Sequence, residues 1–280
     1  MTRSFIGLGL LALSGLACAA DDDGDAITPY RPSVSSPAQL PMPGQLEVEL
    51  GGLHARSIEV RRSSVPYAFK LAFSKEWGVV IGGEAHVWAH DDTGKAQGLG
   101  DTTLVLKRAF LVDEASAFGV ELGAKLPTAN DSIGSGRTDY TLNTIYSRDI
   151  GAVHMDANLS ATRLGAFDDG TGRTQFGLSA SFSGALSDHW GLTGEVSGTH
   201  RAGTANGTQV LAALTYSPSK RLTFDFGVAR AFRPTPGTTQ VFAGVVFPLA
   251  KGATAKTILL RTGGYRTWTL PLTAALEGPG

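Results

Sequence analysis

The sequence has very little cysteine: Cys18 is the only one in 280 residues. We expect the segment that contains Cys18 to be removed, with the mature chain starting near Ala20. On that interpretation the mature protein has no thiol, which excludes disulfides and thiol catalysis. Heme attachment is excluded because the CxxCH motif is absent. The alternative is a lipoprotein with lipid on Cys18, but Gly15 stands where such signals carry an apolar residue.

Long apolar runs and an excess of one charge are also missing. After the first twenty residues no stretch of about twenty apolar residues occurs, so we expect no transmembrane helix. The formal net charge is only -1, which offers no basic surface for a nucleic-acid partner. No GxxxxGK[ST] motif is present, which excludes the common phosphate-binding loop.

The first nineteen residues have the pattern of a secretory signal peptide. Arg3 provides the positive charge, Phe5 to Leu16 forms the apolar region, and Ala17-Cys18-Ala19 fits the cleavage rule. An exported chain without spanning helices is either a soluble protein outside the cytoplasm or a β-barrel in the outer membrane.

A period of two in hydrophobicity runs through most of the chain after residue 44. Between Val153 and Arg163 the odd positions are apolar and the even positions are polar. Successive side chains of a strand point to opposite faces, so such a segment has one apolar and one polar side. The pattern predicts an all-β protein, an antiparallel up-and-down transmembrane β-barrel of about twelve strands. The expected strands are 45–54, 66–75, 77–89, 99–112, 116–127, 138–149, 152–164, 173–185, 189–200, 207–217, 221–232 and 238–248.

The expected domains are the signal peptide (1–19), an extended N-terminal segment (20–44), the barrel (45–249) and a C-terminal extension of unknown structure (250–280). Residues 21–44 contain five prolines, so we expect neither a helix nor a central strand there. Short connections alternate with longer ones at 55–65, 90–98, 128–137, 165–172, 201–206 and 233–237. Outer-membrane barrels alternate short periplasmic turns with long external loops. The 36 glycines suit the bends of a closed barrel.

The polar face of each strand must look into the lumen, because Lys or Arg at the lipid midplane costs about 2–4 kcal/mol. Aromatic residues near strand ends, such as Trp77 and Trp190, suit the girdles at the membrane surfaces. We predict no catalytic, cofactor or metal site. The candidate lumen-lining or selectivity residues are Glu47, Glu49, Lys70, Glu84, His86, Asp101, Lys107, Glu121, Lys125, His154, Asp156, Glu195 and Asp225.

Some of these residues invite a more specific hypothesis. His154 with Asp156, and Glu84 with His86, could hold a metal or exchange protons, but a metal site needs three or four ligands. We favour a hydrated wall for both pairs. For Asp101, between Gly100 and a strand, we favour a turn role. Lys107, Glu121 and Lys125 are expected to form a cross-strand ion network.

Several short motifs resemble the outer-membrane proteins of the putative MetA-pathway of phenol degradation family. They are RPSVSSPAQLPMPGQLEVE from Arg31 to Glu49, GLGDT from Gly98 to Thr102, KLPT from Lys125 to Thr128, the glycine-rich loop before Asp139, and the strand from Gln240 to Phe247. The likeness covers roughly residues 29–249. It implies an outer-membrane barrel that moves hydrophobic or aromatic compounds, and it brings no catalytic or ligand residues.

The leading hypothesis is a non-enzymatic channel or transporter in the bacterial outer membrane. Its partners would be outer-membrane lipid and small hydrophobic or aromatic solutes, which pass through the lumen or leave it laterally. About twelve strands leave a narrow lumen, and the inward charges either select solutes or pair and plug it. The alternatives are an outer-membrane lipid hydrolase, with Ser and His facing lipid near the rim, and a soluble periplasmic lipocalin-like binder. The sequence does not indicate the oligomeric state.

Overall fold

The structure, a computed structural model, describes residues 25–234 and 237–250. The expected signal peptide and the extension beyond residue 250 lie outside the described residues. The described chain forms thirteen strands: β1 (Leu46–Arg56), β2 (Arg61–Ala72), β3 (Trp77–Asp91), β4 (Gly94–Gly98), β5 (Thr102–Leu111), β6 (Ser116–Leu126), β7 (Asp139–Ile150), β8 (Val153–Arg163), β9 (Thr174–Ala185), β10 (Trp190–Arg201), β11 (Gly207–Ser219), β12 (Leu222–Arg233) and β13 (Thr238–Ala250). Within these ranges there is no helix long and apolar enough to cross a bilayer.

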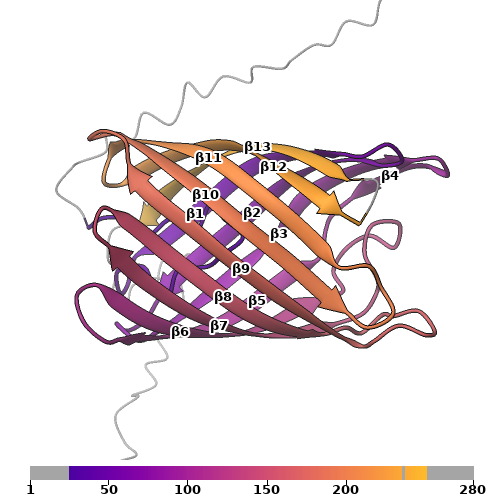
Figure 1. The fold of residues 1–280 in the computed structure, drawn as a ribbon, viewed down its shortest axis with the longest axis horizontal. Helices are drawn as coiled ribbons and strands as arrows, with labels where there is room; N and C mark the ends of the chain where they lie inside the picture. The colour runs from indigo at the N-terminus through magenta and orange to yellow at the C-terminus, as the bar shows by residue number, and fades with distance from the viewer. Residues whose placement is uncertain (1–24, 235–236, 251–280) are drawn as a thin grey trace, which may run out of the picture.

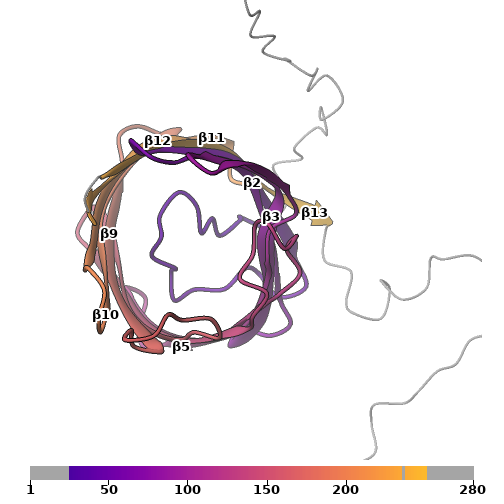
Figure 2. The same cartoon turned by 90° about the vertical axis from the view of Figure 1, so that its right-hand side faces the viewer.

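The strands close into an antiparallel barrel (Figures 1 and 2). Each ring strand pairs with its neighbours in sequence, and β1 completes the ring by pairing with β13. Of the thirteen strands β4 pairs with β3 alone, so twelve close the ring. This confirms the predicted fold class and strand number.

For two of the six connections expected to be long, the expectation is wrong. β1 and β2 stay paired to Arg56↔Arg61, so their turn contains only residues 57–60. β3 continues to Asp91 and turns into β4, so residues 90–98 are mostly a hairpin (Figure 1). The outward side of these strands turns polar beyond the apolar belt, so their sequence there resembles that of a loop. The long connections lie at the end of the barrel that we call the long-loop end; the opposite end is the short-turn end.

The apolar flank of the strands faces outward and the charged flank faces inward. Leu122 is 56% exposed on the outside, while Lys70 and Glu47 are 0% exposed inside. A soluble binder would bury the apolar flank, so the lipocalin-like alternative is wrong. At the short-turn end the rings of Trp190 and Tyr216 lie 4.9 Å apart, where a membrane girdle is expected.

Residues 25–44 run through the inside of the barrel (Figure 2). The segment is extended and irregular, as its prolines predict. At the short-turn end the Ile27 N–H donates to the Lys220 carbonyl, and further along Pro43 bridges to Ala72 just before β1. We call residues 27–39 the plug segment. Its place in the lumen was not predicted.

Candidate functional site: the lumen and its plug segment

The plug segment first contacts a buried charge cluster on β1 and β2. The Lys70 Nζ lies 3.0 Å from Glu47 and 2.6 Å from Glu49, and it donates to the Thr28 carbonyl. Glu47 accepts the Thr28 N–H at 3.0 Å, and Glu49 accepts the Tyr30 N–H at 2.7 Å. Buried charges are tolerated only when they are paired and hydrogen-bonded. These lining residues therefore serve to hold the plug segment.

The Tyr30 ring lies between two buried ammonium groups. The Nζ atoms of Lys70 and Lys107 are 4.2 Å and 4.1 Å from its centroid. Lys107 also pairs with Glu121 at 3.1 Å and donates to the Pro37 carbonyl. Cation–π attraction strengthens when the cation is desolvated, and both lysines are 0% exposed.

Arg31 anchors the plug segment to the other side of the closing seam. Its Nε and Nη2 each donate to the Asp225 carboxylate at 2.9 Å. The guanidinium lies against Gly51 of β1 and Gly244 of β13, which are register partners. A Cβ on Gly244 would stand 2.4 Å from the Arg31 Nε, so any larger residue there would displace the guanidinium.

The centre of the plug segment is bound to the wall formed by β8, β9 and β10. Glu195 Oε2 accepts the N–H groups of Val34 and Ser35 at 2.8 Å each. The Ser35 hydroxyl donates to the Ser179 hydroxyl at 2.9 Å. Two hydrogen bonds of 2.9 Å, one in each direction, link the Ser36 backbone to the Asn158 side chain. Side chains here replace the backbone partners that a strand would have.

His154 and Asp156 lie in contact at the short-turn side of the same wall. The His154 Nε2 is 3.1 Å from Asp156, and its Nδ1 is 2.6 Å from Asp149. Asp156 also accepts a hydrogen bond from Ser147. Among the described residues no group of three His, Cys, Asp or Glu side chains is placed to hold a metal.

A second charge cluster lies near the long-loop end, on β3, β5, β6 and β7. Lys125 pairs with Asp101 at 3.2 Å and with Asp139 at 2.9 Å. The predicted network is therefore wrong in part: Lys107 and Glu121 pair, but Lys125 belongs to this other cluster. Asp101 also accepts the Ala129 N–H at 3.0 Å, which ties the β6–β7 loop to the start of β5.

Glu84 and His86 do not share a face. Glu84 points inward and forms a two-point ion pair with Arg62, at 2.6 Å and 2.5 Å. A register irregularity in the β2–β3 pairing follows Glu84. His86 instead stacks on Trp88, whose side chain is 47% exposed, with ring centroids 4.4 Å apart. The bulge reverses the alternation, which a strict period of two does not foresee.

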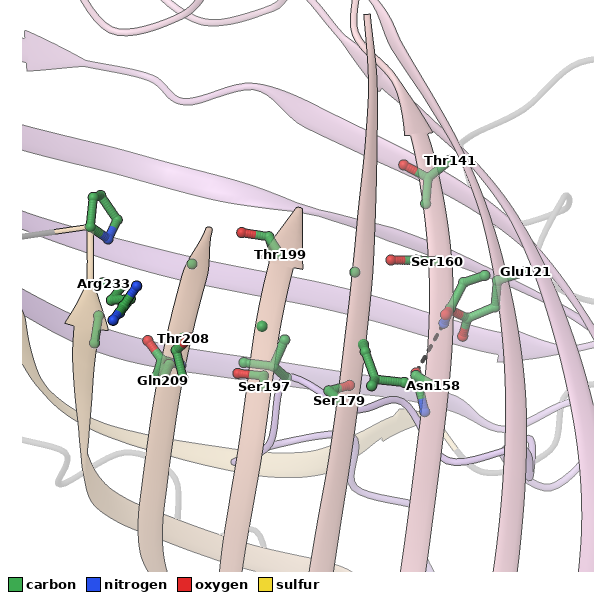
Figure 3. A pocket seen from close by; sticks show the side chains of 18 residues that line it. Glu121, Thr141, Asn158, Ser160, Ser179, Ser197, Thr199, Thr208, Gln209 and Arg233 are labelled. Atoms are coloured by element: carbon green, nitrogen blue, oxygen red, sulfur yellow. Dashed lines mark hydrogen bonds between the residues drawn. The ribbon is translucent and has the colours of Figure 1, made fainter. Parts of the chain in front are cut away.

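Cavities remain on both sides of the plug segment. One cavity, of about 540 Å³, lies toward the long-loop end against β6 to β12 (Figure 3). Its lining combines apolar surface from residues such as Val34, Leu178 and Ala231 with polar side chains that are mostly hydroxyls and amides, with one carboxylate and one guanidinium. The labelled polar residues are Glu121, Thr141, Asn158, Ser160, Ser179, Ser197, Thr199, Thr208, Gln209 and Arg233. A cavity of about 330 Å³ lies between the plug segment and His154, Ser181 and Thr193, and another of about 440 Å³ opens at the short-turn end.

Apolar side chains also line part of the lumen. Leu211, Ala213 and Ala229 form a buried cluster with Phe242 packed against it. A Cβ on Gly227 would stand 2.6 Å from the Phe242 ring, so the ring lies directly over that glycine. Sequence reasoning missed this patch. The signal available was weak alternation, since β11 reads Val-Leu-Ala-Ala-Leu over residues 210–214.

One Ser–His contact lies on the outer surface. The His54 Nδ1 is 2.9 Å from the Ser63 hydroxyl, and the two residues are register partners on β1 and β2. The alternation gave no sign of this pair, because the part of the chain that contains Ser63 was expected to be a loop. No hydrogen bond to the other His54 nitrogen is found among the described residues.

The fold is similar to those of several solved outer-membrane proteins. An outer membrane channel from Pseudomonas putida F1 has a TM-score of 0.62 and 13% identity, covering 75% of this chain and 97% of that chain. The NanC porin (TM-score 0.53, 8% identity) and the KdgM porin (TM-score 0.50, 12% identity) each cover 71% of this chain and 98% of theirs. No curated protein matches.

The fold is thus that of an outer-membrane channel-type β-barrel. Residues 21–248 match the family described as "Putative MetA-pathway of phenol degradation", and the chain belongs to that family. The resemblance stated from the motifs is therefore confirmed.

Proposed function

We propose that this protein is a non-enzymatic channel that carries small hydrophobic or aromatic compounds across the bacterial outer membrane. The signal peptide would direct its export, and the long loops would face the outside of the cell. Family membership, the lipid-facing apolar belt and the apolar patch around Phe242 support this proposal. The inward charges hold the plug segment, so they act on solutes through it.

One observation carries the proposal: two cavities lie along the same wall, one on the long-loop side of the plug segment (the upper cavity) and one on its short-turn side (the lower cavity). Ser160, Ser179 and Ser197 line the upper cavity, and Ser181, Ser183 and Thr193 line the lower one, all on β8 to β10. Between them stand the contacts of Ser35 and Val34 with Ser179 and Glu195. A small shift of residues 33–36 would join the two cavities. The solute path therefore follows this serine-rich wall.

A reversible cross-link tests this path. The Ser35 and Ser179 hydroxyls are 2.9 Å apart, so Ser35→Cys with Ser179→Cys places two sulfurs within reach of a disulfide. Proteoliposomes containing this variant should take up phenol or toluene when reduced and lose most uptake when oxidised. The single Ser179→Cys variant, treated alike, is the control. No uptake of any aromatic solute by the wild type would overturn the proposal.

Lateral exit through the wall is the competing route for the same function. β3 pairs with β5 only from Trp77 to Gly83, and the later part of β3 pairs with β4 instead. The β3–β5 seam therefore has seven register pairs, against ten for β5–β6. Uptake that persists in the oxidised cross-linked variant would assign transport to this seam rather than to the serine-rich wall.

The lipid hydrolase stays a second candidate because of the His54–Ser63 contact near the rim. A Ser–His hydrolase needs a third group that orients the histidine and donors for an oxyanion. A phospholipase assay of the refolded barrel, with Ser63→Ala as control, separates the two functions. Ester hydrolysis that depends on Ser63 would favour the hydrolase.

A further inference from the structure

Outward-facing arginines line up at the long-loop end of neighbouring strands. Arg61 of β2 is the register partner of Arg56 of β1. Thr239 of β13 is the partner of both Arg56 and Arg230 of β12. All three arginines are exposed, and each lies on the same face of its strand as the lipid-facing residues. The closing seam of the barrel therefore carries three cations in one cross-strand row.

The row continues onto the β3–β4 hairpin. His90 is the register partner of Arg61, and Lys95 is the partner of His90. Both are exposed. We call Arg230, Arg56, Arg61, His90 and Lys95 the outer cationic row. Because the strands of a barrel are tilted, the row is inclined to the barrel axis.

Among the described residues no ion pair includes Arg56, Arg61, Arg230 or Lys95, whereas Asp91 interacts electrostatically with His90. The cations that form ion pairs in the described residues are Arg31, Arg62, Lys70, Lys107, Arg108, Lys125 and His154. Arg62, next in sequence to Arg61 but inward-facing, binds Glu84 at two points. Like charges directly opposite on a sheet destabilise it. Arg56 and Arg61 therefore stand in an arrangement that an external anion would stabilise.

The position of the row decides what kind of anion fits. On the same outward faces, Val228 and Val241 lie one pair below Arg230 and Thr239, and both are exposed in the apolar belt. Trp88, at the level of Ser63, is a large amphipathic side chain of the sort found at membrane surfaces. An anion at this height is the headgroup of a lipid whose chains lie against the belt.

We propose that the outer cationic row binds the phosphorylated sugar headgroup of a lipid in the outer leaflet. Arginine suits phosphate because its planar fork donates two parallel hydrogen bonds. Arg56 and Arg61 have Cβ atoms about 5 Å apart, close enough to share one phosphate. Arg230 lies two strands away, about 10 Å, where a second phosphate of the same headgroup fits. Thr239 accepts from the Arg230 Nη1 at 2.5 Å and fixes that guanidinium.

The His54–Ser63 pair lies two register pairs below Arg56 and Arg61, on the same outward face. The His54 Nε2, which has no hydrogen bond among the described residues, would face the sugar hydroxyls or acyl carbonyls of such a lipid. This inference rests on placement in the outer membrane and does not require any particular solute.

Lipid binding can be measured on the purified full chain by native mass spectrometry. The probe is lipid A with two phosphates, and the comparison ligand has the same acyl chains without phosphates. Wild type should hold the phosphorylated lipid and release the dephosphorylated one. Replacing Arg56, Arg61 and Arg230 together by Gln should weaken binding about a hundredfold, because each cation near a membrane surface contributes about a factor of five.

Arg163→Gln is the matched control, since Arg163 is also exposed at the end of its strand but its partners are Tyr140 and Thr174. It should bind within about twofold of wild type, as expected for a cation outside the row. Heat-modifiable migration on gels checks folding, and Arg61→Gln alone, about fivefold weaker, serves if the triple variant does not fold. Equal binding by the arginine variants, or of the dephosphorylated lipid, would overturn the proposal. So would displacement of the lipid by polygalacturonate, which would indicate a soluble polyanion. We expect the triple variant to take up phenol in proteoliposomes as the wild type does. Loss of lipid binding with unchanged uptake would then be independent of the channel function.

Discussion

Arg31 and Asp225, 194 positions apart in the chain, form a two-point ion pair inside the barrel. The pair joins the plug segment to β12, beside the seam where β1 meets β13. The Asp225 side chain is only 1% exposed. The pair therefore makes the plug segment part of the folded barrel wall.

Breaking this pair should loosen the plug segment. Asp225→Asn leaves the Arg31 charge without its carboxylate, and removing one partner of a buried pair costs about 3 kcal/mol. We expect a lower free energy of unfolding in urea and a larger single-channel conductance. Asp188→Asn, in an exposed turn, is the control for loss of a carboxylate. Conductance equal to wild type would contradict the anchoring role.

Filling the space beside Arg31 should have a similar effect by a steric route. Gly244→Ala places a Cβ 2.4 Å from the Arg31 Nε, whereas a Cβ on Gly52 meets nothing within 4 Å. We expect Gly244→Ala to lower the free energy of unfolding by about 1–3 kcal/mol. Gly52→Ala, measured in the same lipid, should change it far less. Equal values for the two variants would show that the guanidinium simply moves aside.

Lys107 should be the most sensitive cation of the lumen. Lys107→Met removes the partner of Glu121 and the donor to the Pro37 carbonyl, and it takes one ammonium from the Tyr30 ring. We expect a loss of about 3–5 kcal/mol in unfolding free energy. The double variant with Glu121→Gln should lose less than the two single variants added together. Strict additivity would show that the two charges do not interact.

The β6–β7 loop should depend on Asp101. Asp101→Asn weakens the contact with Lys125 and changes the acceptor of the Ala129 N–H. We expect faster amide hydrogen exchange in residues 127–138 and no change in β9 or β10. Asp168→Asn, in another long loop, is the control. Unchanged exchange in the loop would mean that Asn130, which accepts the Leu99 N–H at 2.7 Å, holds the loop alone.

A turn outside the membrane gives a prediction for pH. In the β5–β6 turn the Ser116 hydroxyl and the Ala115 N–H donate to Asp113, which lowers the pKa of that carboxyl. A lowered pKa in the folded state means that the stabilisation is present above the pKa of the unfolded chain and is lost as pH falls through the folded value. The stability difference between wild type and Asp113→Asn should therefore be larger at pH 7 than in strong acid. A constant difference would contradict this assignment.

The order and direction of the strands followed from the sequence. In β8 the alternation is strict, because one flank meets hydrocarbon and the other meets polar groups, and a single slip would exchange them. It placed Glu47, Lys107 and Asp225 inside correctly. The alternation did not predict the strand ends near Arg56 and Ala89, because the strands extend beyond the apolar belt there and both of their faces become polar. It also failed at the bulge after Glu84, since alternation cannot register an extra residue.

The sequence by itself determined a barrel with apolar outer and charged inner flanks, because a strand in lipid must repeat every two residues. It also determined that residues 25–44 are neither helix nor central strand, because their prolines lack the N–H donor. Only the tertiary structure decided that this segment fills the lumen, since its partners Glu49, Glu195 and Asp225 come from distant strands. The alignment of Arg56, Arg61 and Arg230 also depends on closure, because β12 and β1 meet only through β13. Local patterns set which way each side chain points, and register across the closed ring sets which ones meet.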